Sequence, residues 1–332
     1  MIWKNLVTPS SLLVPTAVTA KSIILHSKVL KYDKIEYREE EGYLEMNVAK
    51  DWQDYEILDM ANGEKLERWK NVILVRPDPQ IIWTQKSFPE KWKNVNAKYH
   101  RSSTGGGKWE YNKKMPESWQ IKYKNLTFNI KPMGFKHTGL FPEQAVNWDW
   151  MIEKIQKANR EIKVLNLFAY TGGATVACLS AGASVCHVDS SKGMTTWAKE
   201  NVISSGLGDK KVRFIVDDVV KFVNREIRRG NKYDAIVMDP PSYGRGAKGE
   251  VWQFEENIYD LVELCTKVLS DAPLFFLINS YTTGISSTVL KNILNITVEK
   301  NHKGKVECGE IGIPMEESKL VLPCGIYGRW EK

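Results

Sequence analysis

The chain has 332 residues, of which 42% are hydrophobic, 11% aromatic and 26% charged, a composition that is typical of folded globular proteins and excludes wholesale disorder. No run approaches about 18 consecutive apolar residues, so the sequence predicts no membrane-spanning helix. Lys and Arg number 47 against 40 Asp and Glu, and this excess of seven positive charges is a mild indication of an anionic partner.

Residues 1–40 are predicted to be an N-terminal arm. The first 32 residues contain four lysines but no arginine, aspartate or glutamate. Transit peptides are usually rich in arginine, and the apolar run 11–20 is interrupted by Pro15 without a clear cleavage signal. We therefore expect an ordinary terminal arm here.

Residues 41–132 are predicted to form a β-rich basic domain. Short apolar runs alternate with polar turns, and the Asn62-Gly63 dipeptide is typical of a hairpin. Residues 71–75 and 119–131 have the composition and alternation of strands.

The basic charge of this domain is concentrated between residues 83 and 136. That segment has 12 Lys and Arg against three acidic residues, interleaved with ten aromatic residues. Lysines neutralise phosphates and flat rings stack on bases, so the segment predicts RNA contact, with Arg101, Lys108 and Trp109 as candidate substrate-binding residues. The alternative is that the rings form the core of the domain and the lysines form a solvated face.

Residues 133–332 are predicted to form an α/β domain with a mainly parallel, Rossmann-like sheet of seven strands and helices on both faces. The predicted strands are 163–168, 184–188, 212–216, 233–238, 272–279, 305–313 and 325–330. The predicted helices are 143–159, 174–181, 192–205, 219–229, 257–269 and 287–297. A ligand of such a sheet binds beyond the carboxyl ends of the strands.

Three motifs follow three successive strands of this sheet. Gly172 and Gly173 form a tight turn in which a ligand can approach the backbone closely. Asp189 is placed to accept hydrogen bonds from ribose hydroxyls, and Asp217 or Asp218 from an adenine amino group. Because the first motif is not GxGxxG, the pattern favours an adenosine cofactor over a dinucleotide. Taken singly, each feature is also typical of a tight turn or a helix N-cap.

A fourth motif, Asp239-Pro240-Pro241-Ser-Tyr243-Gly-Arg245, follows the fourth strand. Two prolines stiffen the loop. Asp239 can bind a base amino group or an ammonium, Tyr243 can stack on a flipped base, and Arg245 can contact a phosphate. The alternative is a rigid turn without a functional role.

With these motifs the sequence resembles class I S-adenosylmethionine-dependent methyltransferases. It is most similar to the bacterial family of large-subunit ribosomal RNA methyltransferases that act on cytosine C5 or guanine N7. The resemblance is carried by residues 141–144, 166–173, 187–191, 197–201, 217–219 and 239–243, and upstream by 76–79 and 105–110.

The resemblance implies S-adenosylmethionine as the cofactor and RNA, most of all ribosomal RNA, as the acceptor. It implies that Gly172, Asp189 and Asp218 contact the cofactor and that Phe141 and Gln144 close over it. The same motifs supply further candidate cofactor-binding residues: Asn166, Phe168, Tyr170, Thr171, Gly173, Ser190, Ser191, Asp217 and Asp239. Asp239, Pro240, Pro241 and Tyr243 are the candidate catalytic residues. Both a monomer and a homodimer remain open.

The cysteines bear on the atom that is methylated. Methylation of cytosine C5 needs a thiolate that adds to C6, and relatives with this chemistry carry a cysteine after the fourth or fifth strand. Here those loops read DPPSYG and INSYTT, and Cys308 and Cys324 fall in the last two strands, where we expect core positions. The sequence therefore favours direct in-line transfer to a ring or amino nitrogen.

The cysteines and histidines also limit the choice of cofactor and compartment. The five cysteines form no CxxC pair, which excludes a disulfide framework and fits a cytoplasmic location. The five histidines have no ligand spacing, so no metal site is predicted.

Three other functions remain open at this stage. The acceptor could be a protein or a small molecule, in which case the basic segment should not bind RNA. The chain could be an RNA-binding relative without catalysis, or a nicotinamide-dependent dehydrogenase. Binding of S-adenosylmethionine, NADH and RNA separates these alternatives.

Overall fold

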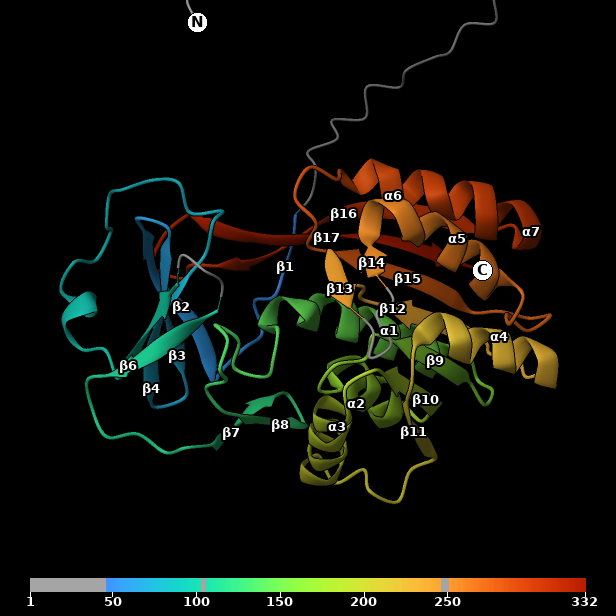
Figure 1. Cartoon of the computed structure of the whole chain (residues 1–332), viewed down its shortest axis with the longest axis horizontal. Helices are drawn as coiled ribbons and strands as arrows, with labels where there is room; N and C mark the ends of the chain where they lie inside the picture. Colours follow the sequence, from blue (N-terminus) through green and yellow to red (C-terminus); the bar gives the residue numbers. More distant parts are fainter. Residues whose placement is uncertain (1–45, 103–105, 246–250) are drawn as a thin grey trace, which may run out of the picture. The chain divides into compact units, whose positions relative to one another are not determined.

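The computed structural model describes residues 46–102, 106–245 and 251–332 (Figure 1). The predicted arm, residues 1–40, lies outside the described residues. Residues 43–332 belong to one compact unit. No helix in the described ranges has the length and apolar character needed to cross a membrane.

The larger sheet has eight strands in the order β1-β16-β17-β15-β12-β9-β10-β11 (Figure 1). Neighbouring strands are parallel except at β17, which is antiparallel to both β15 and β16. The strands are β1 Asn47–Val48, β9 Lys163–Leu167, β10 Ser184–Asp189, β11 Val212–Val216, β12 Ala235–Met238, β15 Phe275–Ser280, β16 Lys305–Pro314 and β17 Val321–Glu331. The predicted mainly parallel α/β sheet is thus confirmed, with one strand more than the seven predicted.

The additional strand is β1, which pairs in parallel with β16 so that Asn47 lies opposite Ile311. A strand of two residues has no alternation that a sequence pattern could reveal. The N-terminal β-rich region therefore begins inside the larger sheet.

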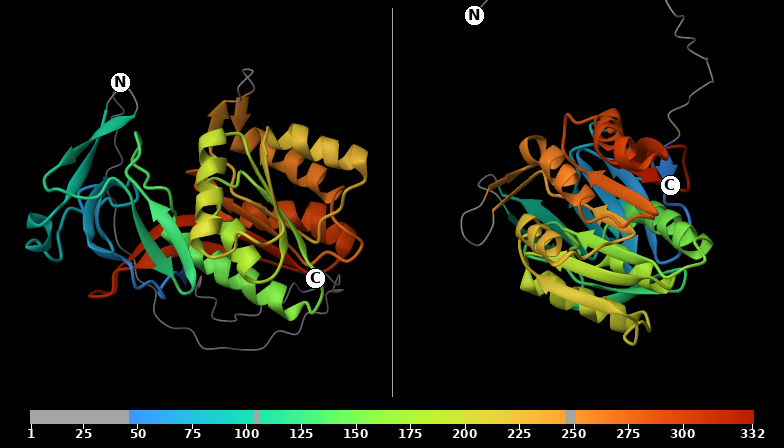
Figure 2. Two further views of the ribbon diagram at one scale, coloured as in Figure 1. Left: turned by 90° about the horizontal axis from the view of Figure 1, so that it is seen from below. Right: turned by 90° about the vertical axis from the view of Figure 1, so that its right-hand side faces the viewer.

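Helices cover both faces of this sheet (Figure 2). They are α1 Ala145–Lys157, α2 Gly173–Ser180, α3 Lys192–Ser204, α4 Val219–Arg229, α5 Phe254–Thr266, α6 Ser287–Leu294 and α7 Lys300–His302, with 3-10 turns at Lys91–Lys93 and Pro142–Gln144. Helix α6 continues into α7 through a π-helical segment, Asn295–Glu299.

Alternate residues of each strand face the two layers of helices, as the period of a strand requires. On β15, Phe275 and Leu277 pack in the cluster that includes α1, α2 and α3. Phe276 and Ile278 pack in the cluster that includes α4, α5 and α6. Strands buried on both faces read as continuous apolar runs, and this is why the sequence pattern found them.

The N-terminal β-rich region contains a five-stranded sheet, β2-β3-β4-β5-β6, and a separate hairpin, β7-β8. Its strands are β2 Tyr55–Ala61, β3 Glu64–Trp69, β4 Val72–Pro77, β5 Ala97–Arg101, β6 Gly107–Tyr111, β7 Trp119–Tyr123 and β8 Leu126–Ile130. Asn62 and Gly63 have φ values of 53° and 73°, as the turn between β2 and β3 requires.

The core of this region is continuous with the core beside α1. The Trp148 ring of α1 lies 5.1 Å from the Phe128 ring of β8 and 6.2 Å from the Trp52 ring, measured between centroids. All three side chains belong to one buried cluster that also reaches the larger sheet.

Candidate active site

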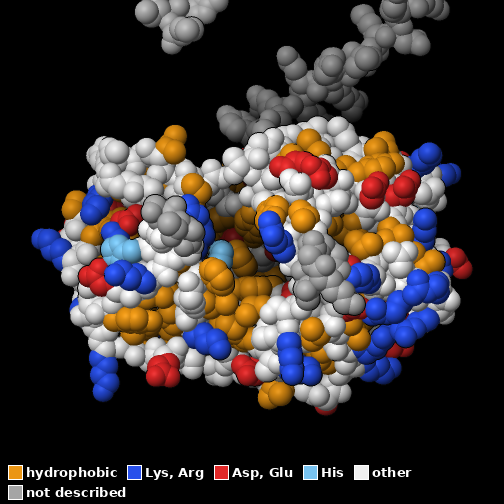
Figure 3. Space-filling view, viewed as in Figure 1, with side chains coloured by type: hydrophobic (Ala, Val, Ile, Leu, Met, Phe, Trp, Pro, Cys, Tyr) orange, Lys and Arg blue, Asp and Glu red, His pale blue; other side chains and the backbone are white. Residues whose placement is uncertain are grey.

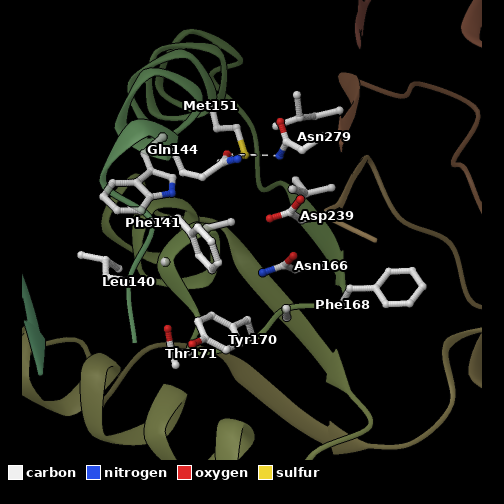
Figure 4. Close-up of a pocket in the computed structure, with 16 residues that line it drawn as sticks. Leu140, Phe141, Gln144, Met151, Asn166, Phe168, Tyr170, Thr171, Asp239 and Asn279 are labelled. Carbon is white, nitrogen blue, oxygen red and sulfur yellow. Dashed lines mark hydrogen bonds between the residues drawn. The ribbon is translucent and has the colours of Figure 1, made fainter. Parts of the chain in front are cut away.

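A pocket with about 480 Å³ of empty space lies at the carboxyl ends of β9, β12 and β15, beside the start of α1 (Figure 4). The predicted site residues that line it are Phe141, Gln144, Asn166, Phe168, Tyr170, Thr171, Gly173 and Asp239. The structure therefore brings together side chains from three separate motifs.

The turn between β9 and α2 forms one wall of this pocket under backbone strain. Phe168 and Tyr170 have φ values of 52° and 49°, in the left-handed region that residues with a Cβ seldom adopt. The backbone N–H of Tyr170 donates to a carboxylate oxygen of Asp189 at 2.8 Å, which fixes the turn to the next strand. Such strain persists only where surrounding contacts hold it, and it clusters at functional sites.

The two glycines of this turn are required by packing. Gly172 has a φ of 82°, and a Cβ there would lie 2.9 Å from the Cβ of Ala198 on α3. A Cβ on Gly173 would lie 2.7 Å from the ring of Trp148 on α1. Gly173 lines the pocket, whereas Gly172 does not. The absence of a Cβ at both positions lets α2 approach α1 and α3 closely.

The acidic residues at the ends of β10 and β11 do not line the pocket. Asp189 also accepts from the N–H of Ser191 at 2.8 Å, and burial raises the pKa of its carboxyl. Asp218 caps α4 by accepting from the N–H of Lys221 at 2.9 Å, and Asp217 pairs with Arg225. These carboxylates therefore have local structural partners.

The two serines after Asp189 also lie outside the pocket lining. Ser191 is the N-cap of α3, where its hydroxyl accepts from the N–H of Met194 at 3.3 Å. Ser190 is exposed.

Asp239 has a buried oxygen without a partner. Among the described residues, no group donates a hydrogen bond to its buried Oδ1. Burial and the nearby Glu143 raise the pKa of its carboxyl to about 7. An orphaned acceptor beside a pocket fits a ligand that brings its own positively charged donor, as an amino-acid ammonium does.

An amide network adjoins this carboxylate at the start of α1, and Figure 4 shows its bond from the side-chain amide of Asn279 to Oε1 of Gln144, at 3.2 Å. Asn147 donates to Oε1 of Gln144 and to Oδ1 of Asn279, both at 2.8 Å. The Oδ1 of Asn147 in turn accepts from the guanidinium of Arg329, at 3.1 Å from Nε. Gln144 and Asn279 are thereby fixed in orientation on the pocket side of the network.

The rest of the Asp-Pro-Pro loop lies outside the pocket lining. Pro240 is buried, and the carbonyl of Pro241 accepts from the indole of Trp252 at 2.6 Å. Tyr243 is 53% exposed, and its hydroxyl accepts from Arg245 at 2.9 Å. These two residues belong to β13 Tyr243–Arg245, which pairs with β14 Val251–Gln253 in a hairpin where the sequence predicted only a loop.

The candidate substrate-binding residues Arg101, Lys108 and Trp109 lie on β5 and β6. The first two side chains are exposed. The indole of Trp109 donates to the carbonyl of Met133 at 2.8 Å, and the Met133 sulfur lies 3.5 Å from the Tyr170 hydroxyl. Met133 thus links Trp109 of strand β6 to Tyr170 in the pocket wall.

Most aromatic rings of the basic segment do not offer free faces. Tyr99 and Tyr123 are buried. The indoles of Trp83 and Trp92 are partly buried and donate to partners within the β-rich region, whereas Tyr111 is 59% exposed. For most of these rings the alternative, a role in the core, is therefore correct.

The five cysteines are free thiols. Cys308 is partly exposed and belongs to no buried cluster of the described residues, so the prediction that it is a core residue is wrong. Cys324 is partly exposed too, but it packs against the core cluster. In the hairpin formed by β16 and β17, Cys308 lies opposite Gly328, and Cys324 lies at the irregularity where the register of the two strands shifts. No group of three metal-ligating side chains occurs in the described ranges.

Several pocket residues were missed by the sequence analysis. They are Leu140, Trp148, Met151, Ala169, Ala174, Val237, Leu277 and Asn279. Asn279 carried a usable signal, since it is a polar residue at the carboxyl end of an otherwise apolar strand. The apolar residues carried none, because a side chain that lines a pocket has the same pattern as one in the core.

A family model described as S-adenosylmethionine-dependent methyltransferase matches residues 90–285. A solved structure of an S-adenosylmethionine-dependent methyltransferase from Agrobacterium tumefaciens is 34% identical, covers 86% of this chain and 93% of that chain, and has a TM-score of 0.82.

Two curated relatives are similar over much of this chain. The ribosomal RNA large subunit methyltransferase K/L of Colwellia psychrerythraea is 28% identical over 76% of this chain. The ribosomal RNA large subunit methyltransferase K of Neisseria meningitidis is 25% identical over 68%. The matches span 35% and 61% of the length of these two relatives.

The match of the family model and the likeness to the Agrobacterium structure agree with the α/β fold described above. The chain belongs to the family of S-adenosylmethionine-dependent methyltransferases, and S-adenosylmethionine is its cofactor.

Proposed function

We propose that the protein transfers a methyl group to a nitrogen of a nucleobase in RNA, with ribosomal RNA as the first candidate. The observation that carries this proposal is the buried, unpartnered Oδ1 of Asp239 in the pocket at the carboxyl edge of the sheet. The relatives named as ribosomal RNA methyltransferases support RNA as the acceptor.

The pocket residues fit the cofactor. When bound, S-adenosylmethionine supplies an electrophilic methyl group on a sulfonium. Asp239 would hold an ammonium, or the amino group of the acceptor base, and Phe141 and Gln144 would cover the cofactor. Asp189 would accept from the ribose hydroxyls as well as from the backbone N–H of Tyr170. Asp218 would accept from the adenine amino group as well as from the backbone N–H of Lys221.

Transfer to nitrogen needs positioning and no covalent catalyst. Burial raises the pKa of the Cys324 thiol well above its ordinary value, which disfavours the thiolate that cytosine C5 chemistry requires. This supports a ring or amino nitrogen as the acceptor atom. Tyr243 would stack on a base of the RNA next to the acceptor, and Arg245 would contact a phosphate.

RNA would contact two surfaces. In the β-rich basic domain, residues 41–132, the exposed Arg101 and Lys108 supply charge. On the methyltransferase domain, residues 133–332, Lys and Arg side chains gather over α4 (Figure 3), whose last turn carries Arg228 and Arg229. Phosphate contacts of this kind make affinity fall as salt rises. The free thiols support a cytoplasmic location.

The experiment that tests this function uses S-adenosylmethionine with a tritiated methyl group, the purified full chain, and total RNA and protein from a strain that lacks the gene. We expect label in large ribosomal RNA and an N-methylated nucleoside after digestion. Label confined to protein or small molecules would refute an RNA acceptor. A 5-methylcytidine product would refute transfer to nitrogen.

A further inference from the structure

A second pocket adjoins the first and has no role in the account above. It holds about 1070 Å³ of empty space and lies where β3 and β4 face the start of α1 and the segment after β15. Leu140 and Phe141 line both pockets. On the face drawn in Figure 3, the surface is hollowed between these parts of the molecule, with hydrophobic side chains beside the hollow.

The shared wall is aromatic. The Phe141 ring lies 5.6 Å from the Tyr170 ring of the first pocket and 5.5 Å from the Tyr281 ring of the second, between centroids. The His137 ring lies 5.2 Å from Phe141 on the second-pocket side. A ligand in the second pocket therefore meets several flat rings and lies next to the cofactor pocket.

Hydrogen bonds fix the orientation of this wall. The Tyr281 hydroxyl donates to Oε1 of Glu143 at 3.0 Å and accepts from the side-chain amide of Gln144 at 2.7 Å. Glu143 faces the second pocket and Gln144 faces the first. The rings are thus held by the same short segment that covers the cofactor pocket.

The second pocket contains three cations, of which one lacks an acidic partner. Lys65 pairs with Asp78 at 3.1 Å, and Arg76 is paired with the buried Glu67. Lys136 contacts only the carbonyl of Pro77, at 3.5 Å, and no carboxylate of a described residue lies within ion-pair distance of its ammonium. A cation held at the edge of a ring-lined pocket suits a ligand that combines a flat ring with a phosphate.

The second pocket also presents a neutral imidazole. Burial and the neighbouring cations Arg76, Lys136 and Lys65 lower the pKa of His137 to about 3, so its imidazole can accept a hydrogen bond. Burial raises the pKa of Glu143 above its ordinary value, which weakens the ionisation of this carboxyl. A neutral acceptor such as His137 can bind the edge of a base without placing a further positive charge against it.

We propose that this second pocket receives the methyl-acceptor base, a single nucleobase turned out of the RNA, with the adjoining phosphate at Lys136. The inference rests on the proposed function and specifies where its acceptor binds. In-line transfer requires the acceptor atom and the methyl donor to be held side by side, and these two pockets share a wall. The rings of Phe141, Tyr281 and His137 compensate for the stacking that the extruded base loses.

The test compares three variants of the full chain in methyl transfer to total RNA. Thr283 lines only the second pocket and is exposed, so Thr283→Trp fills that pocket without touching the first. Lys136→Met removes the unpaired cation. Lys291→Met removes an exposed lysine of α6 and serves as the charge-matched control. Binding of S-adenosylmethionine by calorimetry reports whether the first pocket and the fold are intact.

We expect Thr283→Trp to lower the rate of transfer at least about tenfold, equal to about 1.4 kcal/mol, while the affinity for S-adenosylmethionine changes less than about twofold. Lys136→Met should raise the KM for RNA and reduce the slope of log KM against log salt concentration by about one. Lys291→Met should change neither quantity.

The outcomes separate this inference from the proposed function. If wild-type protein labels RNA and Thr283→Trp and Lys136→Met do so equally well, the second pocket is not the acceptor site, although the proposed function stands. If wild-type protein labels no RNA, both proposals are overturned. If Thr283→Trp loses cofactor binding, Lys136→Met alone decides, since it leaves the volume of the pocket open.

Discussion

The ring of Trp148 on α1 lies only 2.7 Å from the ideal position of a Cβ on Gly173 of α2. Both residues line the pocket at the carboxyl ends of β9, β12 and β15. The glycine turn and the first helix of the methyltransferase fold therefore fit each other at the pocket wall, and neither can change alone.

Replacing Gly173 with Ala tests this fit. The added methyl group would displace a buried indole, and overpacking of this kind costs about 1–3 kcal/mol. We expect the free energy of unfolding in urea to fall by that amount. Gly134→Ala is the control, because Gly134 has open space around it and no positive φ. Equal stability of Gly173→Ala and Gly134→Ala would contradict the close approach of α1 and α2.

Replacing Asp239 with Asn should stabilise the cofactor-free protein at high pH. The pKa of the carboxyl rises from an ordinary 3.8 to about 7 on folding. Ionisation of this carboxyl therefore lowers the stability of the folded protein. This loss of stability is absent below about pH 4 and complete above about pH 7. At about pH 8 the variant should be more stable by a few kcal/mol, at about 1.4 kcal/mol per pKa unit, and near pH 4 the two proteins should match. A stability difference that does not depend on pH would show that Asp239 is not desolvated.

The same carboxyl should make cofactor affinity depend on pH. Only ionised Asp239 attracts an ammonium, so the affinity for S-adenosylmethionine should increase as pH rises from about 6 to about 8. Calorimetry with Asp239→Asn should show weaker binding and a flatter pH profile. An equally steep profile in the variant would assign the titration to another group.

Replacing Cys324 with Ala tests the choice of acceptor atom. Cys324 lines the second pocket, beside Tyr281 and Glu143. If transfer goes to nitrogen, the variant should keep its rate within about twofold, since no covalent bond to the thiol is formed. Mass analysis of the methylated nucleoside completes the test. Complete loss of transfer together with a 5-methylcytidine product in the wild type would assign Cys324 as a nucleophile.

Replacing Arg329 with Met should destabilise the fold and loosen the pocket. The change leaves Oδ1 of Asn147 buried without this donor, which costs about 1–3 kcal/mol. Because Asn147 orients Gln144 and Asn279, affinity for S-adenosylmethionine should fall as well. Arg228→Met, at an exposed position of α4, should leave thermal unfolding and cofactor binding unchanged.

The α/β part of the fold could be predicted because its signals are local. Residues 212–216 and 219–229 were predicted with the bounds that β11 and α4 have in the structure. The hairpin of β13 and β14 was missed, since three-residue strands around glycines give no alternation. Strand β1 was missed for the same reason, and only pairing with β16 makes it a strand.

The site was predictable where polar residues follow strands, and not where function depends on tertiary contact. Asp239 and Asn166 were found in this way. Tyr281 and Lys136 were not, because they are distant in sequence and acquire a shared pocket only through the fold. For the aromatic rings of residues 83–136 the sequence suggested function where most rings have a structural role. The same pattern of rings suits both base stacking and a β-rich core.

The continuous core around Trp148 bears on how the protein can grip its substrate. A clamp that closes on RNA by rotating one body against another needs two bodies whose cores are separate. Here Trp52 and Phe128 of the β-rich region pack on Trp148 of α1 within a single cluster, so rotation would shear a close-packed interior. Under the proposed function, the RNA would therefore adapt to a preformed surface, and the protein would select RNAs that present an extruded base at little cost in lost stacking.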